Sequence, residues 1–209
     1  MHLFLIRHGE SVGNRSGKIQ GWIDFPLSEL GKKQAELVAR RFSDEKLDAI
    51  YSSDLVRAYE TAKEIALKKG MTVRRWPSVR EVYLGPFQGL TRKEIYEKYP
   101  EVKKKTILTS GVPETETVAE LTERCRLVIN DLQTKHDDER VAVVSHGGFI
   151  SILLMYILTG EKWHTYHRPF QISNTSITHV EWKKNEKPVI HYVNETNHLR
   201  SLSKNIEIP

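Results

Sequence analysis

The sequence contains one cysteine, Cys125, and no long hydrophobic run. A single thiol cannot form a disulfide within the chain, which excludes the disulfide framework of a small secreted protein. The longest apolar stretch, residues 149–158, is roughly half of the ~20 residues that a membrane helix needs. The apolar start, MHLFLI, meets charged residues too soon to be a signal peptide. We therefore expect a cytoplasmic protein without a membrane span.

The sequence also lacks internal repeats, low-complexity blocks and Gly/Ser-rich or Pro-rich linkers. Its 209 residues are enough to bury a hydrophobic core, so we expect a single domain over residues 1–209. Lys and Arg outnumber Asp and Glu by 32 to 27, a mild excess that is typical of a solvated surface. No aromatic residues accompany the basic run Lys103-Lys104-Lys105, so we expect no nucleic-acid partner.

Strand and helix patterns alternate along most of the chain. Short apolar runs predict strands at 3–6, 47–51, 73–76 and 141–144, and helical periodicity predicts helices at 28–42, 55–69, 115–134 and 147–159. Two alternating runs, 176–182 and 189–194, with Asn185 and Pro188 between them, predict a closing hairpin. The expected fold is a three-layer α/β/α sandwich with a mostly parallel mixed sheet.

Residues 85–113 interrupt this alternation. They surround one short amphipathic helix with glycines and prolines, namely Gly85, Pro86, Gly89, Pro100, Gly111 and Pro113. We expect this segment to be an excursion from the main sheet that covers a site.

Charged or polar loops follow three of the expected strands: residues 7–10, 52–57 and 145–148. Ligands bind outside the carboxyl ends of strands in open α/β sheets, so these loops should bring Arg7, His8, Arg57 and His146 to one rim. Guanidinium groups match phosphate oxygens in a bidentate way, and helix N-termini add backbone donors. The pattern therefore predicts an oxyanion pocket.

Other chemistries have little support in the sequence. It contains no Walker-type loop, no HExxH and no GxSxG, which argues against nucleotide-loop, metalloprotease and serine-hydrolase activities. His164 and His167 stand three residues apart, but no nearby carboxylate or cysteine completes a ligand set, so we expect no metal site.

Four segments occur in an order that resembles the histidine phosphatase superfamily, in the branch with the cofactor-dependent phosphoglycerate mutases and related small phosphatases. They are LIRHGES with Asn14, SSDLVRAYETA, REVYLGPFQGL and VVSHGG, and the resemblance spans nearly the whole chain. It implies a phosphoglycerate mutase-like fold.

The resemblance also implies roles for individual residues. It makes His8 a covalent nucleophile and Glu81 the general acid and base, while Trp22 would lie near the substrate mouth. The residues implied to hold the phosphoryl group or the substrate are Arg7, Asn14, Gln20, Gly21, Arg57, His146 and Gly147. Preplaced cations stabilise the charge that spreads over a transferring phosphoryl group, so no metal and no cofactor is implied.

Some assignments stay open at this point. Arg80 and Glu81 are also compatible with an ordinary surface pair, in which case Glu10 is the alternative acid. The aromatic residues Trp22, Tyr83 and Phe87 are candidates for either the core or the pocket wall.

The resemblance leaves three functions open. Mutases of this family carry a longer insertion after the acid loop, with a lysine and a Trp-Arg-Arg element, and residues 89–116 contain no such element. We therefore expect a phosphomonoester phosphatase that forms a phosphohistidine and acts on small phosphorylated metabolites. The alternatives are a phosphoglycerate mutase and a non-catalytic protein that binds a phosphorylated ligand. The sequence leaves the substrate and the oligomeric state open.

Overall fold

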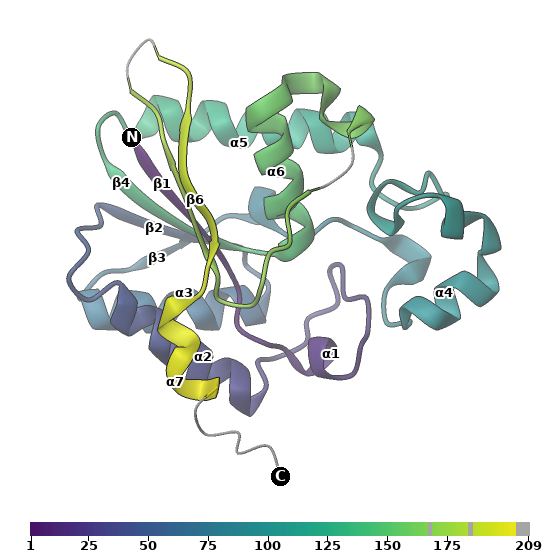
Figure 1. Ribbon diagram of the computed structural model, residues 1–209, viewed down its shortest axis with the longest axis horizontal. Helices are drawn as coiled ribbons and strands as arrows, with labels where there is room; N and C mark the ends of the chain where they lie inside the picture. Colours follow the sequence, from purple (N-terminus) through teal and green to yellow (C-terminus); the bar gives the residue numbers. More distant parts are fainter. Residues whose placement is uncertain (167–168, 184–185, 204–209) are drawn as a thin grey trace.

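A six-stranded sheet lies at the centre of the protein in a computed structural model that describes residues 1–166, 169–183 and 186–203 (Figure 1). The strand order is β3-β2-β4-β1-β5-β6. The strands are β1 (His2–Arg7), β2 (Ala49–Ser52), β3 (Val73–Arg75), β4 (Arg140–Ser145), β5 (Ile177–Glu181) and β6 (Val189–Glu195). β3, β2, β4 and β1 pair in parallel, whereas β5 is antiparallel to both β1 and β6. The expectation of a mostly parallel mixed sheet is confirmed.

Helices cover both faces of the sheet, as Figure 1 shows. Leu3 and Leu5 of β1 belong to the core cluster that includes α5 (Val118–Lys135) and α6 (Gly147–Thr159). The alternate residues Phe4 and Ile6 belong to the cluster on the other face, with α2 (Glu29–Arg41) and α3 (Val56–Lys69). This period-2 alternation on strands buried on both sides produces the predicted three-layer sandwich. Cys125 of α5 is fully buried in the first cluster.

The helix starts depend on local and on distant partners. α5 begins at Val118, later than its pattern predicts, because Thr117 and Glu120 form a capping box there. Ser52, Ser53 and Asp54 are polar residues of the kind that cap helices, but none of them caps α3. Leu55 occupies the N-cap position without a side-chain bond, and Asp24 accepts a hydrogen bond from Val56 N at 2.6 Å. A loop distant in sequence therefore caps this helix.

The segment after β3 extends beyond the sheet (Figure 1). It contains η1 (Pro77–Val79), η2 (Gly85–Phe87), α4 (Arg92–Lys98), η3 (Pro100–Lys104) and η4 (Ile107–Thr109). Its buried residues Phe87, Ile95, Val102 and Ile107 join the α5 and α6 cluster, which anchors the segment to the sandwich.

The remaining elements are short. They are α1 (Val12–Arg15), η5 (Gly160–Thr165), η6 (Asn197–Leu199) and α7 (Arg200–Ser203). β5 and β6 form the predicted hairpin, and Asn185 in its expected turn lies outside the described residues. Within the described ranges, no helix combines the length and the apolar character that a membrane crossing requires.

Candidate active site

Strand pairing brings the three predicted loops to one edge of the sheet. Arg7 pairs in register with Ser145, and His8 N donates to Ser145 O at 3.0 Å. On the other side of β4, Ser53 N donates to Val144 O at 2.9 Å. The carboxyl ends of β1, β2 and β4 therefore meet, and Arg57 lies in the first turn of α3 directly after them.

His8 lies in the centre of this edge and is only 2% exposed. Its Nδ1 atom is 2.6 Å from Gly9 O, and a carbonyl oxygen can only accept, so Nδ1 carries the ring proton. The lone pair is then on Nε2. Burial, Arg57 and Arg7 together hold the pKa of His8 well below its ordinary value. The result is a neutral imidazole with one nucleophilic nitrogen.

Two arginines flank His8. Arg57 is fully buried and donates to Ile23 O at 2.8 Å and to Gly21 O at 2.7 Å, while Arg7 donates to Ile172 O at 2.7 Å. Burial lowers the pKa of Arg57 to about 10, so the guanidinium stays charged at neutral pH. The Nε atoms of both arginines are buried and have no hydrogen-bond partner among the described residues.

His146 packs behind His8, with their ring centroids 5.0 Å apart. It is fully buried, and its Nε2 lies 2.9 Å from Ser53 Oγ. Its Nδ1 has no partner within the described part of the chain. Burial, followed by Arg57, holds the pKa of His146 well below its ordinary value, so this ring is also neutral.

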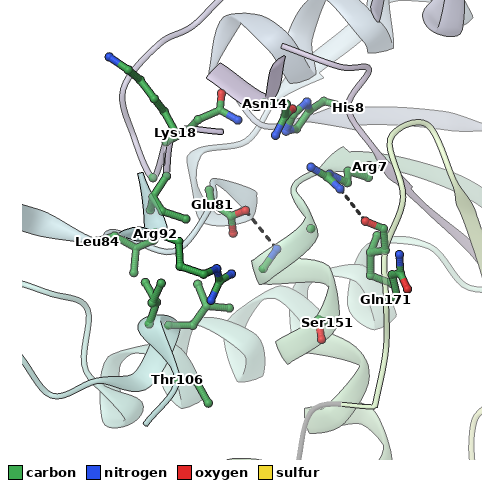
Figure 2. A pocket seen from close by; sticks show the side chains of 18 of the residues that line it. Arg7, His8, Asn14, Lys18, Glu81, Leu84, Arg92, Thr106, Ser151 and Gln171 are labelled. Carbon is green, nitrogen blue, oxygen red and sulfur yellow. Dashed lines mark hydrogen bonds between the residues drawn. The ribbon is translucent and has the colours of Figure 1, made fainter. Parts of the chain in front are cut away.

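Glu81 reaches the same edge from the loop after η1. Its carboxylate accepts backbone N–H groups of Val82 at 2.9 Å, Gly148 at 3.1 Å and Phe149 at 2.8 Å. The dashed line at Glu81 in Figure 2 marks one of these bonds. A Cβ atom on Gly148 would lie 2.6 Å from Glu81 Oε1, so this approach requires glycine. Glu10, the alternative acid, instead accepts from Ser28 Oγ at 2.6 Å and does not line the cavity described next.

A cavity of about 670 Å³ opens in front of these groups. The predicted site residues that line it are Arg7, His8, Asn14, Gln20, Gly21, Arg57, Glu81 and Gly147, and His146 is the predicted site residue that is not among its lining residues. Ser11 orients two of them, because Asn14 Oδ1 accepts from Ser11 N at 3.1 Å and Gln20 Oε1 accepts from Ser11 Oγ at 2.7 Å.

Sequence reasoning missed several cavity residues. Three cations line it, Lys18, Arg92 and Lys105, and so do Ser151 and Gln171. In Figure 2, Arg92 and Thr106 lie across the pocket from Arg7 and His8. Residues 89–116 lack a Trp-Arg-Arg element, but they still place Arg92 and Lys105 at the cavity. Arg92 is the first residue of α4, and the start of that helix was the sequence feature that could have indicated its position.

The aromatic candidates separate into core and surface. Phe87 is fully buried, whereas Trp22 and Tyr83 are 38% and 37% exposed. Their rings pack edge to face at 5.0 Å, and Trp22 Nε1 donates to Glu81 O at 2.8 Å. None of the three lines the cavity. Trp22 thus supports the backbone of Glu81.

The loop that carries Glu81 is held from two further sides. Arg80 forms a bidentate pair with Asp54, next to α3, so it is not an isolated surface charge. Arg124 of α5 donates to Arg80 O at 2.7 Å and to Glu116 at 2.7 Å, and Glu116 also accepts from Tyr83 N at 3.0 Å. These contacts fix the backbone on both sides of the carboxylate.

The described residues contain no group of three or more His, Cys, Asp or Glu side chains that could hold a metal ion. His164 is exposed in η5, and His167 lies outside the described residues. The described residues at the site supply a neutral imidazole, two guanidinium groups and a carboxylate.

The chain is similar to known proteins over most of its length. The chain is 34% identical over 200 residues to phosphoserine phosphatase 1 of Hydrogenobacter thermophilus, covering 94% of this chain and 93% of that protein. It is also 34% identical over 210 residues to the probable phosphoglycerate mutase GpmB of Yersinia enterocolitica, covering 95% of each. A mycobacterial glucosyl-3-phosphoglycerate phosphatase, solved in complex with VO3, superposes with a TM-score of 0.81 at 28% identity, over 93% of this chain and 99% of that one.

The family described as the histidine phosphatase superfamily (branch 1) matches residues 3–196. This confirms the resemblance that the four sequence segments indicate. The protein belongs to branch 1 of the histidine phosphatase superfamily.

Proposed function

We propose that the protein is a phosphomonoester phosphatase that works through a phosphohistidine on His8. One observation carries the proposal. Beside the free Nε2 of His8, the buried nitrogens Arg7 Nε, Arg57 Nε and His146 Nδ1 have no partner among the described residues. Buried donors are normally satisfied, and a phosphoryl group with its several oxygens is a ligand that would satisfy them.

In the proposed reaction His8 Nε2 attacks phosphorus, the N–P bond forms and the ester P–O bond breaks. Glu81 gives its proton to the departing oxygen. It then takes a proton from the water that attacks the phosphohistidine, the N–P bond breaks, and inorganic phosphate and free His8 are released. Arg7, Arg57 and His146 stabilise the charge on the phosphoryl oxygens. We assign contacts with the rest of the substrate to Asn14, Gln20, Gly21 and Gly147. No step requires a metal ion, so activity should survive chelation with EDTA.

We propose small phosphorylated metabolites with a second anionic group as substrates. Besides Arg7 and Arg57, the cations Lys18, Arg92 and Lys105 line the cavity, and a second negative charge on the substrate would offset theirs. Two relatives support this class by their names, phosphoserine phosphatase and glucosyl-3-phosphoglycerate phosphatase.

Phosphoglycerate mutase activity is the second candidate, and similarity to GpmB favours it. Water and a second substrate hydroxyl compete for the same phosphohistidine. We favour water, because residues 89–116 lack the Trp-Arg-Arg element of the mutases.

The proposal also covers the domain organisation, the cellular location and the partners of the protein. We propose that residues 1–209 form one domain whose 85–113 excursion covers the site. We also propose that the protein works in the cytoplasm on free metabolites and has no nucleic-acid partner.

The test is a phosphoenzyme experiment. Brief incubation with a ³²P-labelled phosphomonoester, followed by an alkaline quench, should leave a base-stable, acid-labile label on a peptide that contains His8. His8→Ala should abolish both the label and the turnover. Label on a serine or aspartate, or turnover without any label, would contradict the mechanism. With 3-phosphoglycerate and added 2,3-bisphosphoglycerate, phosphate release should exceed formation of 2-phosphoglycerate, and the reverse ratio would make the protein a mutase.

A further inference from the structure

The Ser53 hydroxyl group meets the ring of His146 beside the proposed phosphoryl site. Both residues are fully buried, and Ser53 Oγ lies 2.9 Å from His146 Nε2. The backbone fixes both partners, because Ser53 N bonds to β4 and His146 forms the N-cap of α6. The function of the pair depends on which atom carries the proton.

A second contact of Ser53 decides the direction of this hydrogen bond. Leu55 N donates to Ser53 Oγ at 3.3 Å, and an N–H group can only donate. Of the two groups that the described residues place at Ser53 Oγ, His146 Nε2 is the one that can accept. The hydroxyl hydrogen is satisfied when it points to Nε2, which must then be unprotonated. A neutral ring in this state carries its proton on Nδ1.

The other edge of His146 leads to the same assignment. Nδ1 is buried without a partner among the described residues, and the ring lies against His8, which the proposed mechanism phosphorylates. A lone pair at Nδ1 would repel phosphoryl oxygens, whereas an N–H group there would donate to them.

We propose that Ser53 is a positioning residue that holds His146 as the neutral, Nδ1-protonated tautomer, so that Nδ1–H donates to a phosphoryl oxygen. This inference rests on the proposed function. His146 keeps its proton in both steps, because Glu81 supplies and recovers the proton that moves. His8 and His146 then share one tautomer but present opposite edges to the substrate: His8 presents the Nε2 lone pair, and His146 presents Nδ1–H.

Nitrogen-15 NMR of histidine-labelled protein tests the tautomer without any need for turnover. We expect a pyridine-type shift at His146 Nε2 and a pyrrole-type shift at Nδ1, both in the free protein and with inorganic phosphate or vanadate. The signals are assigned by their loss in His146→Gln. Ser53→Ala should move both shifts toward tautomer-averaged values. An imidazolium pattern, or a proton on Nε2 in the unsubstituted protein, would overturn the inference even if the phosphatase activity is present.

Kinetics test whether Ser53 acts through His146. Loss of a whole transition-state donor typically costs 10²- to 10³-fold in kcat, so weakening one by Ser53→Ala should cost about 10-fold, with KM changed less than ~3-fold. In the His146→Gln background, Ser53→Ala should cost less than ~2-fold more, because coupled residues are non-additive. Equal losses in both backgrounds would show that Ser53 acts independently of His146, against the proposal.

Ser52→Ala is the matched control. It removes a buried hydroxyl from the neighbouring residue, the last of β2, and this hydroxyl donates to Ser53 O at 2.7 Å rather than to His146. We expect lower stability and an unchanged tautomer. If Ser52→Ala shifts the His146 signals as far as Ser53→Ala does, loop packing sets the tautomer and the proposal fails.

Discussion

At the scale of single residues, backbone groups hold the side chains of the proposed active site in position. Gly9 O orients His8, Gly21 O and Ile23 O hold Arg57, and N–H groups at the start of α6 hold Glu81. Such partners cannot rotate away as side chains can, so the site is organised before a substrate arrives.

Glu81→Gln tests the proton transfer. An alkoxide leaves poorly without a proton, so we expect a rate loss of about 10²- to 10⁴-fold on alkyl phosphates. p-Nitrophenolate leaves with little help, so its phosphorylation step should suffer far less than hydrolysis of the phosphohistidine. Stopped-flow measurement should therefore show a burst and accumulation of phosphoenzyme. Equal losses on both esters without a burst would mean that Glu81 only shapes the pocket.

Arg92→Gln tests the second anionic group. Loss of one charge-assisted contact should raise KM for phosphoserine or 3-phosphoglycerate about 10-fold, or ~1.4 kcal/mol. KM for p-nitrophenyl phosphate should change less than ~3-fold, because that ester has no second anion. Lys103→Gln removes an exposed cation of the same segment that does not line the cavity, and it should change neither KM. A parallel rise for both esters would assign Arg92 to the phosphoryl group itself.

At the scale of elements, α2 packs directly against the loop after β1. A Cβ atom on Gly31 would lie 1.9 Å from Glu10 O, and one on Gly9 would lie 2.5 Å from Gly31 O. The helix backbone therefore packs against the backbone that orients His8. Gly31 falls within the helix predicted at 28–42, but nothing in the local sequence reveals which chain segment lies opposite it.

Gly31→Ala should displace this loop. Overpacking at such a contact typically costs 1–3 kcal/mol, and we expect a stability loss of about that size together with a lower kcat, because Gly9 O moves with the loop. Urea unfolding and steady-state kinetics measure the two effects. Lys33→Ala, at an exposed position of α2, should stay within about 0.5 kcal/mol. Unchanged kcat in a destabilised Gly31→Ala protein would separate the helix contact from catalysis.

The helices and strands also show which parts of the structure the sequence could predict. The alternation of strands and helices, and the motifs at three strand ends, were sufficient for the sandwich, the family and the edge where Arg7, His8 and Arg57 meet. The cap of α3 by Asp24 and the positions of Arg92 and Lys105 at the cavity depend on how distant segments fold back. Contacts of this kind have no local periodicity, so the sequence alone did not predict them.

For the whole molecule, buried and half-buried histidines make stability depend on pH; His179 is half-buried. His179 stacks between Phe4 and His191, with ring centroids 4.5 and 4.4 Å away, and its Nε2 lies 3.1 Å from His2 Nδ1. Burial, then His191, His2 and Arg140, lower the pKa of His179 to about 4, while nearby Glu181 opposes the shift. Since the unfolded chain binds the proton first, this contribution to stability is full above about pH 6.5 and is lost as the pH falls toward 4.

His179→Phe should flatten this acid limb. The shift corresponds to at most about 3 kcal/mol, and partial solvent screening reduces our expectation to ~1–2 kcal/mol. We therefore expect the loss of unfolding free energy between pH 7.5 and pH 4.5 to be smaller in the variant by that amount, as measured by urea denaturation. His8 and His146 keep a similar pH dependence in both proteins. An exposed control, His164→Phe, should leave the dependence of unfolding free energy on pH unchanged. An unchanged dependence in His179→Phe would show that His179 does not cause this loss of stability in acid.

The rate at which the buried thiol of Cys125 is alkylated can report how often the native structure opens. Burial raises the pKa of this thiol to about 12, so alkylating reagents, which attack the thiolate, find almost no target in the closed protein. Labelling must wait until α5 separates from α6 and the sheet, and its rate then reports the free energy of that opening. Because α6 begins at the proposed phosphoryl site, phosphate should slow the labelling by a factor that approaches 1 + [phosphate]/Kd if the opening also breaks the site. With one cysteine in the chain, a single mass shift follows both ligand affinity and native-state opening, and no probe has to be engineered.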